Sequence, residues 1–193
     1  MTHTDSNAMD RLFVAVHLSP DASASLGAWA DKLKPQASFR KWVHPQDYHI
    51  TVQFLGDTPR ERIPELTEGL SAAAAEHAPF TLGVHEAGVF GASVSPRILW
   101  AGIRGDVDAL AKLQRSVVSR METYGFVPED RPYRPHITIA RKFQGDEKFS
   151  MDIIGSPPVN IQWDVHELVL FRTNLHATPM YEIVGVARLS RNF

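Results

Sequence analysis

Two short segments repeat one pair of side chains that can move protons and bind phosphate. His49 begins the segment HITV and His136 begins HITI, so each histidine is followed two residues later by a threonine, Thr51 or Thr138. An imidazole takes up or releases a proton near neutral pH, and a hydroxyl donates a hydrogen bond to a phosphate oxygen. Two such pairs around one phosphorus atom would suit in-line phosphoryl transfer, with a neutral histidine activating water and a protonated one assisting the leaving oxygen.

The composition removes several other kinds of chemistry. The 193 residues include no cysteine, which excludes disulfides, thiolate catalysis and cysteine-ligated metal sites. Neither motif has a carboxylate at the spacing of a metal ligand, so we expect no metal and no cofactor, although a two-histidine metal site is the rival interpretation. The net charge of −2 argues against a protein that coats nucleic acid through an overall positive field, and leaves a locally basic cleft open.

Alternating apolar and polar residues place both motifs on strands. Residues 48–54 and 136–140 combine β-branched and aromatic residues in a period of two. Because residues two apart project from the same face of a strand, each histidine lies beside its threonine while the isoleucine between them enters the core. Each of the two segments therefore presents one imidazole and one hydroxyl together.

The remaining pattern predicts a mixed α+β fold. A helix is expected over 20–33, another with Pro64 in its first turn runs to about residue 77, and a third covers 106–124. A loop is expected between the strands 80–89 and 98–103, and a long loop over 144–158. The further predicted strands are 12–16, 167–171 and 181–187, and the segment 39–42 precedes the first motif strand. We expect two related lobes facing each other across a cleft.

The ends of the sequence suggest one domain after a short foreign segment. Residues 1–10 are polar and patternless, like a disordered or tag-derived N-terminus, and 11–193 form a single bilobal domain. No apolar stretch approaches the roughly 20 residues that span a bilayer, and no signal peptide is evident. We expect a cytoplasmic monomer that does not bind membranes.

Several longer segments carry a family resemblance. They are RLFVA at 11–15, FLGD at 54–57, PRILW at 96–100 and YRPHITIAR at 133–141. With the double His-x-Thr signature, they make the chain similar to the two-histidine phosphoesterases, and among these to the RNA 2′,3′-cyclic phosphodiesterases, also called 2′-5′ RNA ligases. The resemblance implies a bilobal fold of antiparallel strands with outer helices around a central cleft.

The resemblance also implies an activity and residue roles. The substrate would be an RNA ending in a 2′,3′-cyclic phosphate, with tRNA fragments as one candidate, and the product a 2′-phosphate. His49 would protonate the leaving O3′, and His136 would be the base that activates water. Thr51 and Thr138 would hold phosphate oxygens.

Two further residues are assigned by the same resemblance. Arg141 matches a phosphate-binding arginine, and Phe54 matches an aromatic that stacks on the terminal base, although packing in the core is an equal alternative for this side chain. Each lies five residues after its motif histidine, an odd offset that turns it away from the cleft in a regular strand. Both roles therefore require a bend. Arg97 and Arg134 are further candidate cations without an assigned role.

Three functions remain open at this stage. The first is hydrolysis of the cyclic phosphate. The second is the reverse reaction, 2′-5′ ligation of a cyclic end to a 5′-hydroxyl. The third is a module that binds RNA ends without turnover. The intact histidines favour the two catalytic interpretations.

Overall fold

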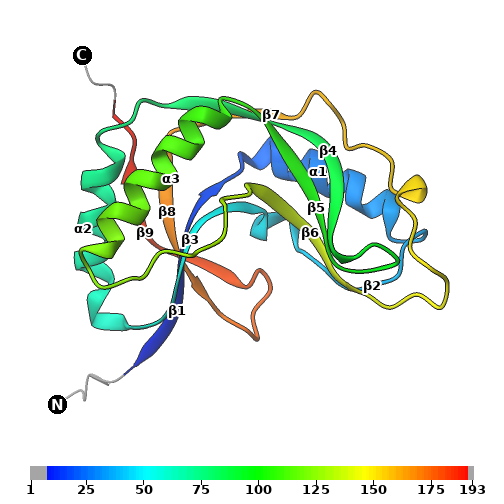
Figure 1. The fold of residues 1–193 in the computed structure, drawn as a ribbon, viewed down its shortest axis with the longest axis horizontal. Helices are drawn as coiled ribbons and strands as arrows, with labels where there is room; N and C mark the ends of the chain where they lie inside the picture. The colour runs from blue at the N-terminus through cyan, green and yellow to red at the C-terminus, as the bar shows by residue number, and fades with distance from the viewer. Residues whose placement is uncertain (1–7, 191–193) are drawn as a thin grey trace.

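A curved antiparallel sheet with helices on its outer side forms the protein (Figure 1), and this computed structural model describes residues 8–190. The strands are β1 (Met9–His17), β2 (Phe39–Trp42), β3 (His49–Pro59), β4 (Phe80–Ala92), β5 (Ser95–Gly105), β6 (His136–Phe143), β7 (Gln162–Val165), β8 (Glu167–Thr173) and β9 (Tyr181–Arg188). The helices are α1 (Pro20–Leu33), α2 (Ile63–Ala74) and α3 (Val107–Glu122), with short 3-10 turns η1 (Pro45–Asp47), η2 (Arg60–Arg62) and η3 (Met151–Ile153).

The sheet joins two lobes through one narrow contact. Its strands follow the order β7-β4-β5-β6-β3-β1-β8-β9, with β2 beside β6, and neighbouring strands run antiparallel. Between β6 and β3 only Ile50 and Ile137 are paired. One lobe holds β3, β1, β8 and β9, and the other holds β2 and β4 to β7, as the two halves of Figure 1 show. The predicted bilobal α+β class is therefore confirmed.

The lobes do not correspond to the two halves of the sequence. The chain leaves the first lobe after β1, returns for β3 and α2, crosses again for β4 and β5, and comes back for α3. Each lobe thus contains strands from both halves of the chain. This interleaving leaves no simple linker between the lobes.

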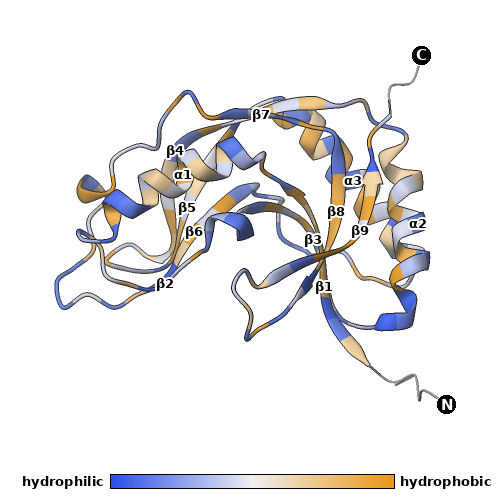
Figure 2. Cartoon of the chain, turned by 180° about the vertical axis from the view of Figure 1, so that it is seen from behind, coloured by the Kyte–Doolittle hydropathy of each residue, from blue (hydrophilic) through white to orange (hydrophobic). Residues whose placement is uncertain are grey.

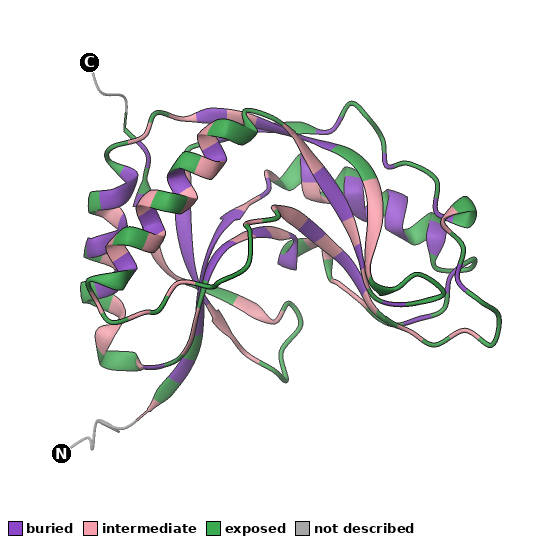
Figure 3. Ribbon diagram, viewed as in Figure 1, coloured by how far each residue is buried: buried purple, intermediate pink, exposed green. Residues whose placement is uncertain are grey.

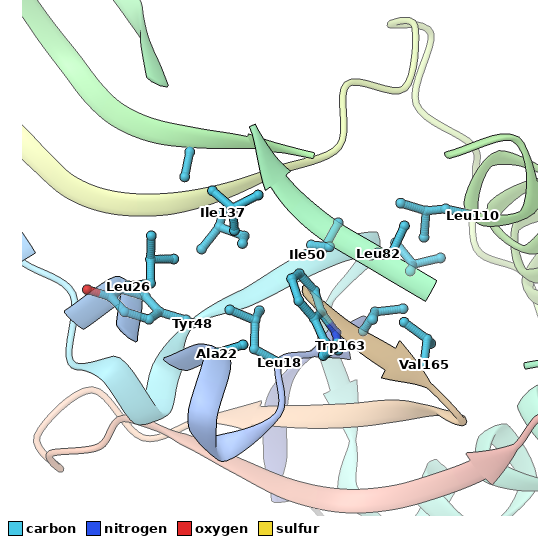
Figure 4. Packing of buried hydrophobic residues seen from close by; sticks show 14 of the residues in the cluster. Leu18, Ala22, Leu26, Tyr48, Ile50, Leu82, Leu110, Ile137, Trp163 and Val165 are labelled. Atoms are coloured by element: carbon cyan, nitrogen blue, oxygen red, sulfur yellow. The ribbon is translucent and has the colours of Figure 1, made fainter. Parts of the chain in front are cut away.

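The core extends under both lobes and fixes the start of β3 and β6. Ile50 and Ile137 are fully buried, and Leu26 of α1 and Trp163 of β7 belong to the same apolar cluster (Figure 4). Apolar residues of α2 and α3 are buried, and Figure 2 shows apolar and polar bands along α2. Burying side chains of this size contributes roughly 1.5–3 kcal/mol each, which holds the two motif strands in place.

Helix α1 forms where the sequence predicts it. Ser19 caps the helix by accepting a hydrogen bond from the backbone N–H of Ala22, and Pro20 occupies the first turn, where its missing N–H costs nothing. Helix α2 ends at Ala74, three residues before the predicted end. Residues 75–77, which follow the helix, form a turn whose backbone N–H groups donate to carbonyls of the last helical turn.

The N-terminal boundary differs from the prediction. Residues 1–7 of the predicted tag-like segment lie outside the described residues, but Met9 and Asp10 already belong to β1. The carboxylate of Asp10 is buried and accepts hydrogen bonds from Arg60 and Arg172. These partners come from distant positions in the chain, so a local pattern could not indicate them.

One predicted loop and one unassigned segment are more ordered than the sequence indicated. The loop expected between 89 and 98 is mostly strand, because β4 and β5 form a hairpin whose turn is confined to residues 93–94. Gln162–Val165 forms the unpredicted strand β7, which pairs with β4 along the edge of the sheet. Four residues are too few for a periodic signal, and pairing with β4 orders them. Within residues 8–190, no helix is long and apolar enough to cross a membrane.

Candidate active site

The His49 imidazole is held at both nitrogens by its own neighbourhood. Its Nδ1 donates to the backbone carbonyl of Asp47 over 2.7 Å, and its Nε2 lies 3.1 Å from the Thr51 hydroxyl. Because a carbonyl only accepts, the proton of the neutral ring sits on Nδ1 and leaves Nε2 as the basic nitrogen. The ring packs between Phe13 and Tyr181, with centroid distances of 4.9 and 5.2 Å.

The His136 imidazole repeats this arrangement in the other lobe. Its Nδ1 donates to the backbone carbonyl of Arg134 over 2.7 Å, again two residues upstream. The His136 ring packs edge to face against the ring of Phe90, with 4.9 Å between the ring centroids and 89° between the ring planes. In the described part of the chain Nε2 has no hydrogen-bond partner. It is therefore the nitrogen available for a substrate.

The single pairing between β3 and β6 brings the two motifs face to face. Ile50 opposes Ile137, so the antiparallel register sets His49 across from Thr138 and Thr51 across from His136. Both isoleucines are buried, so all four motif side chains project from the opposite face. Each lobe therefore contributes one imidazole and one hydroxyl to the same face.

A β-bulge follows each motif and supplies the bend that the odd offset required. In β3, Thr51 pairs with Ala15 and Gln53 with Val14, which leaves Val52 as an extra residue. Two successive residues of β3 are therefore buried, and Phe54 turns outward. The bulge shifts the alternation by one residue.

The same bulge occurs in β6. Thr138 pairs with Trp100 and Ala140 with Leu99, so Ile139 is the extra residue. The first five residues of β3 and β6 have the same pattern of buried and partly buried positions, which Figure 3 shows for β6 as alternating purple and pink bands. Arg141 is then only partly buried, on the side of the histidines.

Arg141 dominates the charge around the two histidines. Burial lowers the pKa of His49 to about 4, and the positive charges of Arg141 and His136 act in the same direction, against the stabilising carbonyl of Asp47. Burial also lowers the pKa of His136, again with Arg141 adding to the effect and the Arg134 carbonyl opposing it. Both rings are therefore neutral at pH 7 in the free protein.

A cavity of about 560 Å³ opens where β3 and β6 diverge. The aromatic rings of Phe54 and Phe90 and the cations of Arg97 and Arg134 are part of its lining, beside His136. Phe54 is 61% exposed, which a core role would not allow. Its exposed ring beside a motif histidine matches the stacking alternative rather than the packing one.

A second cavity, of about 780 Å³, does not contain the motifs. It lies at the C-terminal end of β1, between the start of α1 and the turn from β7 to β8. His17 contacts the carboxylate of Glu167 there, at 3.1 Å. Within residues 8–190, no three histidine or carboxylate side chains cluster as metal ligands.

Two residues around His49 carry no sequence signal of a functional role. The buried carboxylate of Asp47 accepts hydrogen bonds from the backbone N–H groups of Met180 and Tyr181, at 3.0 and 3.1 Å. Its own carbonyl holds His49. Tyr181 opens the last strand, more than 130 residues away, and only the fold brings it to the histidine.

Comparison with known proteins places the chain in a class. It belongs to the 2′-5′ RNA ligase superfamily, whose family model matches residues 19–177. A relative from Geobacillus stearothermophilus, named RNA 2′,3′-cyclic phosphodiesterase, is 40% identical over 174 residues, which are 90% of this chain and 55% of that protein. The relative of the same name from Bacillus subtilis strain 168 is 34% identical over 92% of this chain and 96% of its own length. The chain thus spans about half of the first relative and nearly all of the second.

Solved structures agree with the two-histidine phosphoesterase fold. The E. coli LigT structure in complex with 3′-AMP has a TM-score of 0.76 and 25% identity, and covers 95% of this chain and 100% of that chain. TT0787 of Thermus thermophilus has a TM-score of 0.75 and 27% identity, covering 93% of this chain and 97% of that chain.

Proposed function

We propose that this protein hydrolyses the 2′,3′-cyclic phosphate at an RNA end and leaves a 2′-phosphate. The observation that carries the proposal is the matched pair of imidazoles, His49 and His136, each with Nδ1 bonded to a backbone carbonyl. The Nε2 atom of His49 contacts only the Thr51 hydroxyl of its own motif. The names of the relatives and the family membership support the same activity. The fold supplies one histidine from each lobe, as attack from opposite sides of a phosphorus atom requires.

The proposed reaction moves one proton at each histidine. His136 Nε2 accepts a proton from water as the water oxygen attacks phosphorus. The P–O3′ bond breaks on the opposite side, and protonated His49 gives its Nε2 proton to O3′. The products are a 3′-hydroxyl and a 2′-phosphomonoester. The two histidines end with exchanged protonation states, and solvent restores them.

The lowered pKa values fit this division of work once the substrate is bound. A neutral His136 is ready to act as the base at pH 7. His49 is neutral in the free protein, since its pKa is about 4. The negative charge of the bound phosphodiester favours the imidazolium and raises the pKa of His49. Substrate binding thus creates the acid that the leaving oxygen needs.

The other predicted residues surround this pair. Thr51 and Thr138 would donate hydrogen bonds to the non-bridging oxygens, and Arg141 would balance the phosphate charge. The exposed ring of Phe54, at the mouth of the cavity, would stack on the terminal base. Arg97 and the Arg134 side chain line the same cavity, where they would lie near the RNA backbone.

The deciding experiment is an assay on a short RNA with a 2′,3′-cyclic phosphate end, with chelator present and 2′- and 3′-phosphate products resolved. Wild type should form the 2′-phosphate, and His49→Gln and His136→Gln should each lose at least about 100-fold in rate. His85→Gln, an exposed histidine of β4, is the matched control and should keep full activity. Retained activity in either motif variant would refute the mechanism, and loss of activity with chelator would refute metal independence.

The same site could run the reaction backwards, as the name of the family suggests. A 5′-hydroxyl would then take the place of water and form a 2′-5′ linkage. Joining of cyclic and 5′-hydroxyl ends at high RNA concentration would support this second function. Tight binding of RNA ends without any turnover would instead support the third interpretation, a binding module.

The setting of the reaction is proposed on the sequence alone. We propose a monomer in the cytoplasm that acts on RNA ends such as those of tRNA fragments. Sedimentation, cell fractionation and sequencing of RNA ends that accumulate in a deletion strain would test these three statements.

A further inference from the structure

The hairpin between β8 and β9 is tied to the motif histidine of its own lobe. Asp47 is the tie, because its carboxylate accepts two hydrogen bonds from the backbone of residues 180 and 181 while its carbonyl accepts one from His49. A carboxylate that is 4% exposed and accepts two N–H groups is firmly placed. The start of β9 and the His49 ring therefore form one rigid unit.

Tyr181 lies at the centre of this unit. Its ring meets His49 edge-on, with centroids 5.2 Å apart and planes at 89°, and it also packs on Phe13 and Phe171. An aromatic edge against a face favours one ring orientation over others. Together with the carbonyl on Nδ1, this contact leaves the His49 ring little freedom to rotate away from the cleft.

Arg141 follows the bulge in β6 of the other lobe, and its side chain lies close enough to Tyr181 for its charge and a side-chain hydrogen bond to act on the Tyr181 hydroxyl. Burial raises the pKa of Tyr181, so the hydroxyl is neutral and its oxygen is free to accept a hydrogen bond from the guanidinium. Arg141 is also the cation whose charge acts on both His49 and His136.

We propose that Tyr181 is a positioning residue that aims the Arg141 guanidinium at the phosphate site and fixes the plane of the His49 ring, with Asp47 anchoring Tyr181. Arginine has a long side chain with several rotamers, and binding by a guanidinium held in place costs less ordering entropy than binding by a mobile one. The inference rests on the proposed function in one respect, namely that Arg141 contacts the phosphate.

A double-mutant cycle tests the coupling. Tyr181→Phe keeps the ring and removes only the hydroxyl, so it should raise KM for a cyclic-phosphate dinucleotide roughly tenfold, the effect of one hydrogen bond to a charged group. The turnover number should stay within about twofold, because both proton-transferring histidines are intact. In an Arg141→Gln background the same substitution should change KM by less than about twofold.

The losses in the two backgrounds decide whether Tyr181 acts through Arg141. Equal losses in both backgrounds, or no loss in the wild-type background, would overturn the proposal. Tyr124→Phe is the matched control, since this tyrosine packs against Gly69 away from the cleft, and its KM should equal that of wild type. Melting temperatures of the tyrosine variants should agree within a few degrees, so that altered KM is not a consequence of unfolding.

The affinity of the same variants for inorganic phosphate separates this inference from the proposed function. Isothermal titration calorimetry should show roughly tenfold weaker phosphate binding in Tyr181→Phe and no further weakening when Arg141→Gln is already present. If wild type failed to open cyclic phosphates but showed this coupling, only the proposed function would fall. If turnover were normal and the losses were additive, only the positioning role would fall.

A second variant tests the anchor. Asp47→Asn keeps the shape of the side chain but replaces one of the two oxygens that accept N–H groups from β9. It should raise KM in the wild-type background and have little effect on KM in the Arg141→Gln background. A lower melting temperature with unchanged KM would show that Asp47 supports the fold alone and would remove it from the proposal.

Discussion

Replacing His49 by glutamine should make the protein less sensitive to acid. The folded-state pKa of His49 is about 4, against 6.5 for a free imidazole. Between these values the unfolded chain binds a proton that the folded protein excludes, so stability falls as the pH decreases from 6.5 and levels off below 4. Above pH 6.5 both the folded and the unfolded chain have a neutral His49, so this loss of stability is absent. Glutamine fills a similar volume and cannot titrate, so the variant lacks this penalty.

The size of the effect follows from the two pKa values. The complete shift corresponds to about 3.4 kcal/mol at very low pH, and proton linkage gives about 2 kcal/mol at pH 5 and nearly zero at pH 7.5. The ring is partly exposed, and solvent screening reduces the penalty. We therefore expect wild type to lose about 1–2 kcal/mol more than His49→Gln between pH 7.5 and pH 5.

Urea unfolding at a series of pH values measures this difference directly. The free energy of unfolding of wild type minus that of His49→Gln should decrease as the pH falls, whatever its value at pH 7.5. His85→Gln controls for the loss of one histidine elsewhere in the chain. Parallel curves for wild type and His49→Gln would refute the reasoning, because they would show that burial and the neighbouring cations do not depress the pKa of His49.

Three further predictions concern the scaffold and the substrate. Gly88→Ala should lower the free energy of unfolding by about 1–3 kcal/mol in urea, because the new Cβ would overlap the Trp100 ring; an unchanged midpoint would contradict the packing. Asp10→Asn should cost about 1–3 kcal/mol at pH 7, since two arginines donate to this buried carboxylate. Those arginines lower the pKa of Asp10, with hydrogen bonding from Arg60 the largest cause, so the contribution is lost as the pH falls and the two unfolding curves should converge in acid. Phe54→Leu should leave the melting temperature unchanged because the ring is 61% exposed, yet raise KM roughly tenfold for RNA ends that carry a base and not for abasic ends; equal KM changes for both ends would exclude stacking.

Much of the site could be predicted from local periodicity. The spacing of two in each HIT segment was enough to place His49 beside Thr51, and the structure shows these two side chains in contact. The same alternation indicated that Ile50 and Ile137 are core residues, and both are fully buried. Such predictions succeed because the side-chain direction along a strand depends on the backbone alone.

The tertiary structure decided what lies around the two motifs. The bulges at Val52 and Ile139 redirect Phe54 and Arg141, but a bulge is defined by the partner strand and leaves no reliable mark in its own sequence. Tyr181 reaches His49 only because β9 follows β8 across the sheet. Contacts between residues more than a hundred positions apart depend on how the strands are ordered, and no local pattern of residue types encodes that order.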